Sequence, residues 1–178
     1  MKFLFSFCLL LSMTAAAAAQ STGPAETLAR FFAFDRTHSI EFSARSIESR
    51  KAWFSNELYR LLKTELKREA EYLKKNPGDK PHFGDGLPFR PLDETCDVGR
   101  KKLHKKITFK TGQIRGRTAT VNAAFAFSRP CETPDKNVYV FSMKRIANRW
   151  MIDNVTYDDG PTPLGALPRN EHHLLHPT

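Results

Sequence analysis

The stretch from residue 137 to residue 157, NVYVFSMKRIANRWMIDNVTY, carries the clearest strand pattern in the chain and most limits what the chain can fold into. Two runs rich in β-branched and aromatic residues flank the break Ala147-Asn148, which predicts an antiparallel hairpin in which residue 146 faces residue 149. One face of that hairpin collects Tyr139, Phe141, Met143, Trp150 and Ile152. The other collects Val138, Val140, Ser142, Lys144, Met151, Asp153, Val155 and Tyr157. Because both faces carry apolar groups, we expect the hairpin inside a sheet rather than at its edge.

The N-terminal half of the chain has helical periodicity. Pro24 suits the first position of a helix, and the apolar spacing that follows predicts a helix over about residues 24–35, with a second short helix near residues 47–53. Ser55 is the expected cap of a longer helix that Asn76-Pro77-Gly78 ends. One apolar stripe of this longer helix contains Leu58, Leu61, Leu62, Leu66, Ala70 and Leu73. We expect these stripes to cover a sheet rather than to bind a partner.

Two further strands are expected over about residues 102–113 and 117–128. The second strand alternates two kinds of residue. Its larger set is Ala119, Val121, Ala123, Phe125 and Phe127, and its small or polar set is Thr118, Thr120, Asn122, Ala124 and Ala126. Because the small set leaves volume unfilled, it predicts either a closely packed helix on that face or the floor of a pocket.

The N-terminus has the three parts of a secretory signal peptide: Lys2, an apolar run over residues 3–13, and the alanines of residues 15–19. A buried N-terminal helix is the less favoured alternative, and Cys8 lacks the surroundings of a lipid-modified cysteine. We expect residues 1–19 to be removed, residues 20–160 to form one domain, and residues 161–178 to be a flexible tail containing Pro and His. The exported chain is then periplasmic or secreted, soluble and without a membrane span.

Beyond this leader the chain has two cysteines, Cys96 and Cys131, which in an oxidising compartment predict a disulfide. If Arg115-Gly116 turns a hairpin, Cys96 falls opposite residue 135, and the loop over residues 129–135 can absorb the offset. The alternative, a pair of zinc ligands, lacks the close spacing of zinc sites. The tail residues His172, His173 and His176 lack a rigid setting for a metal, so we expect neither a metal nor a cofactor.

The formal charge of +9 is concentrated in one basic stripe. It contains Arg100, Lys101, Lys102, Lys105, Lys106, Lys110, Arg115 and Arg117, with His104 among them. Such a stripe suits nucleic acid, anionic lipid headgroups or an acidic protein, and export makes nucleic acid the least favoured. The candidate partner-binding residues are Lys101, Lys102, Lys105 and Lys106, and a solvated strand face is the alternative.

No stretch carries a catalytic or cofactor motif. The loop over residues 77–97 contains His82, Asp85, Asp93, Glu94 and Asp97, for which a solvated loop is favoured over a site because turns select Asp and Gly for backbone reasons alone. Asp153 and Tyr157 are the catalytic candidates, although at four residues apart on one strand they are separated by roughly 13 Å. The alternative for Asp153 is a cross-strand partnership with Ser142 or Lys144. Asn154-Val155-Thr156 matches a glycosylation acceptor, but it lies within an expected strand.

The expected elements are helices first, then a Gly-Asp loop, then antiparallel strands. They contain Phe31-Phe32, the loop GDGLPF at residues 84–89, the strand start GRTATV at residues 116–121, and RWMIDNVTY at residues 149–157. In this order and in these residues the chain resembles the nuclear transport factor 2-like superfamily, and within it a family of exported bacterial proteins of unknown function. The resemblance implies an α+β fold in which N-terminal helices pack on a curved antiparallel sheet, like a cone around a pocket. It transfers no catalytic residues.

Members of that superfamily include isomerases, dehydratases and many binding modules, so the fold alone does not give the activity. The first hypothesis is a binding or interaction module of the cell envelope, whose partner is an envelope protein or a small ligand and whose candidate assembly is a homodimer. The alternative is a small-molecule acid-base enzyme of isomerase, dehydratase or hydrolase type that uses the cone pocket. A filled cone would favour the first.

We predict that the mature protein starts at Gln20, because the leader ends in the small residues that signal peptidase requires. Mass spectrometry of the protein from the envelope fraction should give the mass of residues 20–178. A retained Met1, or a mass increment of lipid size, would contradict the prediction.

Overall fold

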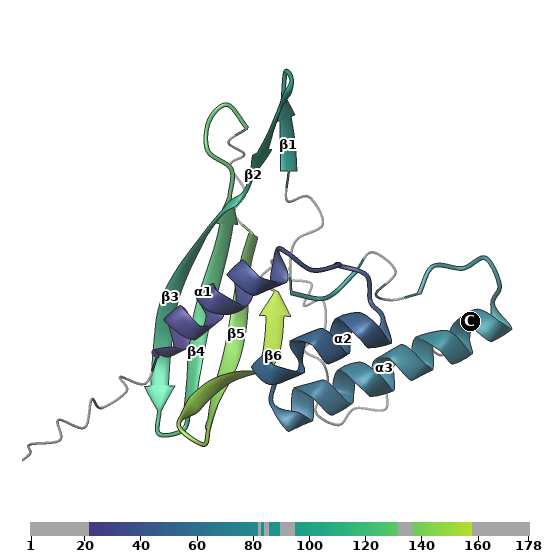
Figure 1. Cartoon of the computed structure of the whole chain (residues 1–178), viewed down its shortest axis with the longest axis horizontal. Helices are drawn as coiled ribbons and strands as arrows, with labels where there is room; N and C mark the ends of the chain where they lie inside the picture. Colours follow the sequence, from purple (N-terminus) through teal and green to yellow (C-terminus); the bar gives the residue numbers. More distant parts are fainter. Residues whose placement is uncertain (1–21, 82, 84–85, 90–94, 132–136, 158–178) are drawn as a thin grey trace, which may run out of the picture.

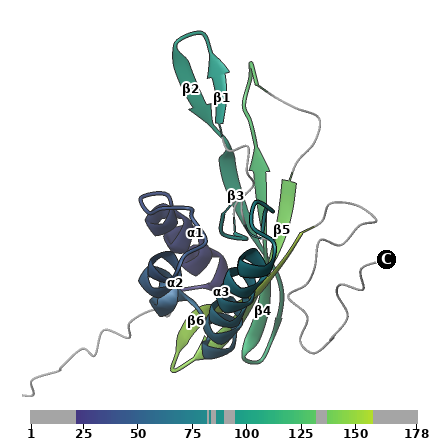
Figure 2. The same cartoon turned by 90° about the vertical axis from the view of Figure 1, so that its right-hand side faces the viewer.

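The computed structural model describes residues 22–81, 83, 86–89, 95–131 and 137–157. In that part of the chain, helices α1 (Pro24–Asp35), α2 (Ala44–Arg50), η1 (Lys51–Trp53) and α3 (Asn56–Lys75) precede all the strands. The strands are β1 (Thr95–Val98), β2 (Lys101–His104), β3 (Lys106–Arg115), β4 (Thr118–Ala126), β5 (Asn137–Ile146) and β6 (Arg149–Tyr157). The helices lie together on one side of a curved antiparallel sheet (Figures 1 and 2), which confirms the predicted α+β class.

The helix boundaries follow local sequence signals. Helix α1 has the predicted bounds, with Pro24 in its first turn. Ser43 caps α2 by accepting a hydrogen bond from the Ser46 amide, so this helix begins three residues before the predicted start. Ser55 caps α3 as expected, because its Oγ accepts from the Leu58 amide at 3.0 Å.

The sheet has the order β3-β4-β5-β6, and β1 and β2 form a separate two-stranded hairpin. The sequence prediction was wrong at three points here. Strand β1 lies in a stretch expected to be loop, and the single strand expected over residues 102–113 is divided at Lys105 into β2 and β3. The turn between β3 and β4 is also one residue later than predicted, because Arg115 faces Thr118 and Gly116 takes a φ of +58°.

The hairpin formed by β5 and β6 begins in the predicted register, with Ile146 facing Arg149. Ala147 and Asn148 have φ values of 47° and 64°, as a type I′ turn requires. A β-bulge then shifts the register, so that Met143 faces Ile152 but Ser142 faces Asn154.

The bulge makes the predicted division of faces wrong beyond Ile152. Asp153 and Val155 are buried, and Val155 faces the core residue Phe141 across the strands. The predicted position inside the sheet is also wrong, because β6 is the last strand of the four-stranded sheet. Its edge is partly covered where Phe54 bridges to Ile152 and the Ser55 amide donates to the Ile152 carbonyl at 2.8 Å.

Aromatic rings fill the space between α1 and the sheet. The ring of Phe32 lies 5.5 Å from Phe109, 5.5 Å from Phe125 and 5.7 Å from Phe141, so one residue of α1 contacts three strands. Its neighbour Phe31 contacts the rings of Trp53, Phe54 and Phe89 on the helical side. All members of both clusters are buried except Trp53 and Phe109, which are partly buried.

The two faces of β4 do not pack as predicted. The buried residues Ala119, Val121, Ala123 and Phe125 face the helices. The small or polar set lies on the opposite face and is exposed or half-buried, and the described helices all lie on the other side of the sheet (Figure 2). The small residues are thus neither a packing surface for these helices nor the floor of the cone.

A buried ion pair joins α1 to α2. The Arg50 side chain is 0% exposed, and its Nε donates to Oδ1 of Asp35, which is 1% exposed. Its remaining nitrogens donate to the carbonyls of Ser46 and Ser39, each at 2.9 Å, and to Ser49 Oγ at 3.3 Å. Because the guanidinium is desolvated and fully engaged, it fixes the end of α1, the following loop and the end of α2 in one geometry.

We predict that Arg50→Met lowers the free energy of unfolding by about 3–5 kcal/mol, because it leaves the Asp35 carboxylate buried without its guanidinium. The matched control is Arg30→Met, which removes the exposed pair with Glu26 and should cost about 0–1 kcal/mol. Urea unfolding measures both variants. Asp35→Leu combined with Arg50→Met should recover part of the loss, and equal losses in Arg50→Met and Arg30→Met would contradict the account.

Candidate interaction surface

The β1–β2 hairpin extends from one end of the sheet, away from the helices (Figures 1 and 2). Val98 faces Lys101 across the turn Gly99-Arg100, and Gly99 has a φ of +60°, a conformation that glycine adopts without strain. Within the described residues, the extensive contacts of each strand of this hairpin are with the other strand. The hairpin is therefore an arm rather than part of the packed body.

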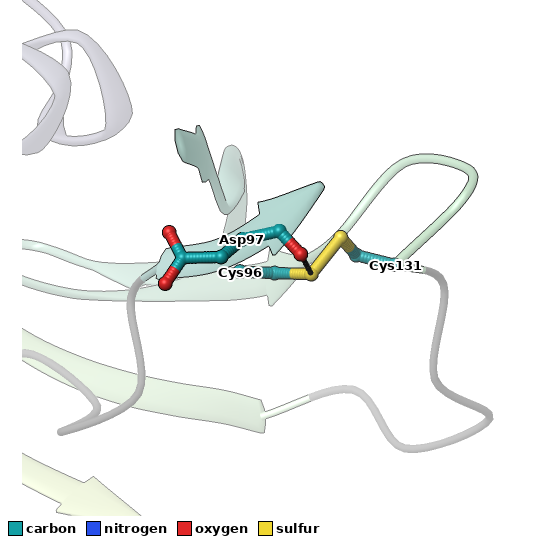
Figure 3. Close-up of a disulfide and its surroundings, with 3 residues drawn as sticks. All are labelled: Cys96, Asp97 and Cys131. Carbon is teal, nitrogen blue, oxygen red and sulfur yellow. Dashed lines mark hydrogen bonds between the residues drawn. A yellow bond between two sulfur atoms is a disulfide. The ribbon is translucent and has the colours of Figure 1, made fainter. Parts of the chain in front are cut away.

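A disulfide ties this arm to the body. Cys96 of β1 is bonded to Cys131, which follows β4, with a Cα–Cα distance of 6.3 Å (Figure 3). The bond confirms the pairing predicted from the sequence. It connects two segments 35 residues apart, so the arm is held by a covalent link as well as by the continuation of β2 toward β3.

Lys105 is the second anchor of the arm, at the break between β2 and β3. It is only 5% exposed, and its Nζ donates to Asn137 Oδ1 at 2.8 Å and lies 5.1 Å from the centre of the Phe127 ring. Its carbonyl accepts from Arg36 Nη2 at 3.0 Å. Lys105 was predicted to be a partner-binding residue, but its charge is buried and lies beside Asn137, the first residue of β5.

The other cations of the basic stripe are exposed. They are Arg100, Lys101 and Lys102 in the arm, Lys106 and Lys110 on β3, and Arg115 and Arg117 around the β3–β4 turn. Between residues 95 and 117 the chain has eight lysines and arginines and one acidic residue, Asp97, so this stretch supplies +7 of the formal charge of +9. The exposed members concentrate positive potential on the arm and the strand that continues it.

The stripe is not continuous. Along β3 the exposed Lys106 and Lys110 alternate with the half-buried Ile107 and Phe109, so these two lysines lie on the sheet face opposite the helices. Arg115 is nine residues beyond Lys106 on the same strand, roughly 30 Å away. We define the basic arm as Arg100, Lys101, Lys102 and Lys106, which lie on or directly beside the β1–β2 hairpin.

The catalytic candidates lie elsewhere. Asp153 is 7% exposed at the bulge of β6, and the backbone of Tyr157 faces Tyr139. Asn154, not Asp153, faces Ser142, so the predicted register is wrong at this point, and Lys144 Nζ lies 4.0 Å from Glu57 Oε2 of α3. Asp153 therefore lies at the bulge and not directly opposite Ser142.

The loop and tail candidates mostly lie outside the described residues. These are His82, Asp85, Asp93 and Glu94 of the loop and His172, His173 and His176 of the tail. Asp97 is exposed on β1 and faces Lys102 across the arm. In the part of the chain that the structure covers, His, Cys, Asp and Glu side chains form no group of three that would hold a metal ion.

The C-terminal half of α3 leaves part of its apolar stripe uncovered. Leu58 and Leu62 are buried as predicted, but Ala70 is exposed and Leu73 is 36% exposed. An open hollow of about 470 Å³ lies beside this half of the helix. It is lined by Ile40, Glu41, Phe42, Leu66, Glu69, Ala70, Leu73, Pro81, Phe83 and Gly86. The prediction that the whole stripe covers the sheet was therefore correct only for the first half of the helix.

Comparison with family models, with curated proteins and with solved structures found no match to this chain. Among the described residues, no helix is both long enough and apolar enough to cross a membrane.

Sequence reasoning located the exposed cations but missed how the arm is positioned. Lys105 looks like its basic neighbours in the sequence, and only the partners Asn137 and Phe127, which come from distant segments, distinguish it. One signal was available, because Lys105-Lys106 breaks the strict alternation expected of a single strand over residues 102–113.

Proposed function

We propose that the protein is a binding module of the bacterial cell envelope that holds an anionic partner through the basic arm. The observation that carries the proposal is the concentration of exposed cations around a projecting hairpin with Asp97 as the single carboxylate between residues 95 and 117. A dense field of one sign attracts ligands of the opposite sign and speeds their encounter with the protein.

Two observations support a location outside the cytoplasm. The N-terminus has the pattern of a secretory signal peptide, and the chain contains a disulfide between segments distant in sequence. Disulfides persist in the periplasm and outside the cell, whereas cytosolic thiols are kept reduced. Periplasmic or secreted placement is therefore part of the proposal.

We favour a binding role over acid-base catalysis because aromatic rings fill the space between the helices and the sheet. An enzyme of the nuclear transport factor 2-like kind would need an open cavity between the helices and the sheet, lined by a base and the group that orients it. The ring of Phe32 packs against those of Phe125 and Phe141 in that space. Among the described residues, these rings occupy the position at which the enzyme alternative, with Asp153 as base, would need its cavity.

Charge reversal tests the proposed surface. The variant Lys101→Glu, Lys102→Glu and Lys106→Glu should weaken capture of the partner from an envelope extract by about tenfold or more, because three attractive contacts become repulsive. Lys105 is left unchanged, since a carboxylate at that buried position would disturb folding.

The matched control is Lys63→Glu, Lys67→Glu and Lys74→Glu, which makes the same charge change on exposed positions of α3. Capture by the control should stay within about threefold of the wild type, the difference that a change in net charge alone would cause at physiological salt. Two results together would support the enzyme alternative instead. Charge reversal of the basic arm would leave capture unchanged, and the protein would turn over a small molecule in a reaction that Asp153→Asn abolishes.

A further inference from the structure

We infer that the anionic partner of the basic arm is a lipid surface: the tip of the β1–β2 hairpin binds anionic phospholipid headgroups without inserting into the bilayer. This inference rests on the proposed function and specifies the partner. Three features of the tip support the inference: its shape, the directions of its charges and the absence of an apolar anchor.

The shape of the arm suits a flat surface. The turn Gly99-Arg100 lies at the end of a hairpin that projects beyond the end of the sheet (Figures 1 and 2). A projecting tip reaches a plane without a clash from the rest of the domain, whereas a protein partner must supply a matching concave site.

The charges of the tip point in different directions. Lys101 faces Val98 and Lys102 faces Asp97, and because consecutive residues of a strand lie on opposite faces, these two lysines extend to opposite sides of the hairpin. Arg100 lies between them and the turn glycine. Such a distribution suits many mobile headgroups around the tip, while a stereospecific protein site would require the cations on one face.

The tip has no apolar or aromatic anchor. The exposed large hydrophobic side chains of the described residues are Ile40, Tyr72, Leu73, Ile114 and Ile146, and all lie outside the hairpin. Val98 and Leu103 within it are half-buried. Protein interfaces draw most of their affinity from a few desolvated aromatic, arginine or apolar anchors, of which the tip offers only Arg100, whereas attraction to an anionic membrane needs only charges near the surface.

The two anchors of the arm hold the tip in a fixed position relative to the domain. The disulfide from Cys96 and the buried Lys105 hold the two strands of the hairpin at their base. The charges of the tip therefore reach the surface together, and no ordering of a loop opposes their binding.

Vesicle sedimentation tests the inference. The probe is vesicles of phosphatidylcholine with about one third phosphatidylglycerol, with pure phosphatidylcholine vesicles as the neutral reference. The exported form of the protein should bind only the anionic vesicles, and raising the salt from about 0.1 M to 1 M should release it, because the Debye length falls from about 10 Å to about 3 Å.

Neutralising the tip with Arg100→Gln, Lys101→Gln and Lys102→Gln should lower the partition coefficient by about 100-fold, since each cation near an anionic surface contributes about a factor of five. The control Arg60→Gln, Lys63→Gln and Lys67→Gln makes the same change on exposed positions of α3 and should lower it by at most about threefold. An equal loss in both variants would show that net charge alone drives binding, and would overturn the inference.

A second measurement, capture of a protein from an envelope extract, separates the inference from the proposed function. If the wild type ignores anionic vesicles but its basic arm captures an envelope protein, the lipid inference fails and the binding function stands. If it binds neither vesicles nor an envelope protein, both fail. Binding to vesicles that depends on the three tip residues supports both.

Discussion

The contact on which the rest of the structure depends is made by two neighbouring phenylalanines of α1. Phe32 packs against rings from β3, β4 and β5, and Phe31 packs against rings from η1, from the segment before α3 and from the loop that contains Phe89. Two adjacent side chains thus join the sheet to the remaining helices. Aromatic pairs in tilted or edge arrangements add about 0.5–1.5 kcal/mol each to the burial of their surface, so this cluster is a main source of cohesion.

The same cluster is the reason why we propose that binding takes place on the outside of the domain. In the part of the chain that the structure describes, the rings of Phe32, Phe109, Phe125 and Phe141 occupy the space between α1 and the sheet. Charge is unevenly distributed over the chain, because the stretch that runs from β1 to the β3–β4 turn contains most of the excess positive charge. The disulfide and Lys105 are then understandable as supports for a hairpin that has little packing of its own.

Local sequence signals were sufficient for much of this fold. Pro24 and Ser55 marked helix starts, Ala147-Asn148 marked the turn of the last hairpin, and the two cysteines gave the disulfide. These features depend on residues close in sequence or on simple pairing, which a single chain reveals.

The features that the sequence did not reveal depend on tertiary contacts. The bulge opposite Ser142 and Met143 inserts one residue without changing composition, so the apolar pattern of β6 was assigned to the wrong face after Ile152. The burial of Arg50 and Lys105 depends on partners that lie far away in sequence, Asp35 and Asn137, so a single sequence does not reveal it. Leu73 belongs to a regular apolar stripe, but α3 extends past the sheet that buries the first half of that stripe.

The central claim is that ligands bind the arm and that the cone is closed, and NMR mapping of the protein labelled with ¹⁵N in its amides and with ¹³C in its phenylalanine rings tests it most directly. On titration with anionic phosphatidylglycerol bicelles, amide shifts should concentrate in residues 97–106, while the signals of Phe32, Phe125 and Phe141 remain unchanged. Shifts centred on those three rings, with the arm unaffected, would show that the cone opens to a ligand and would contradict the account.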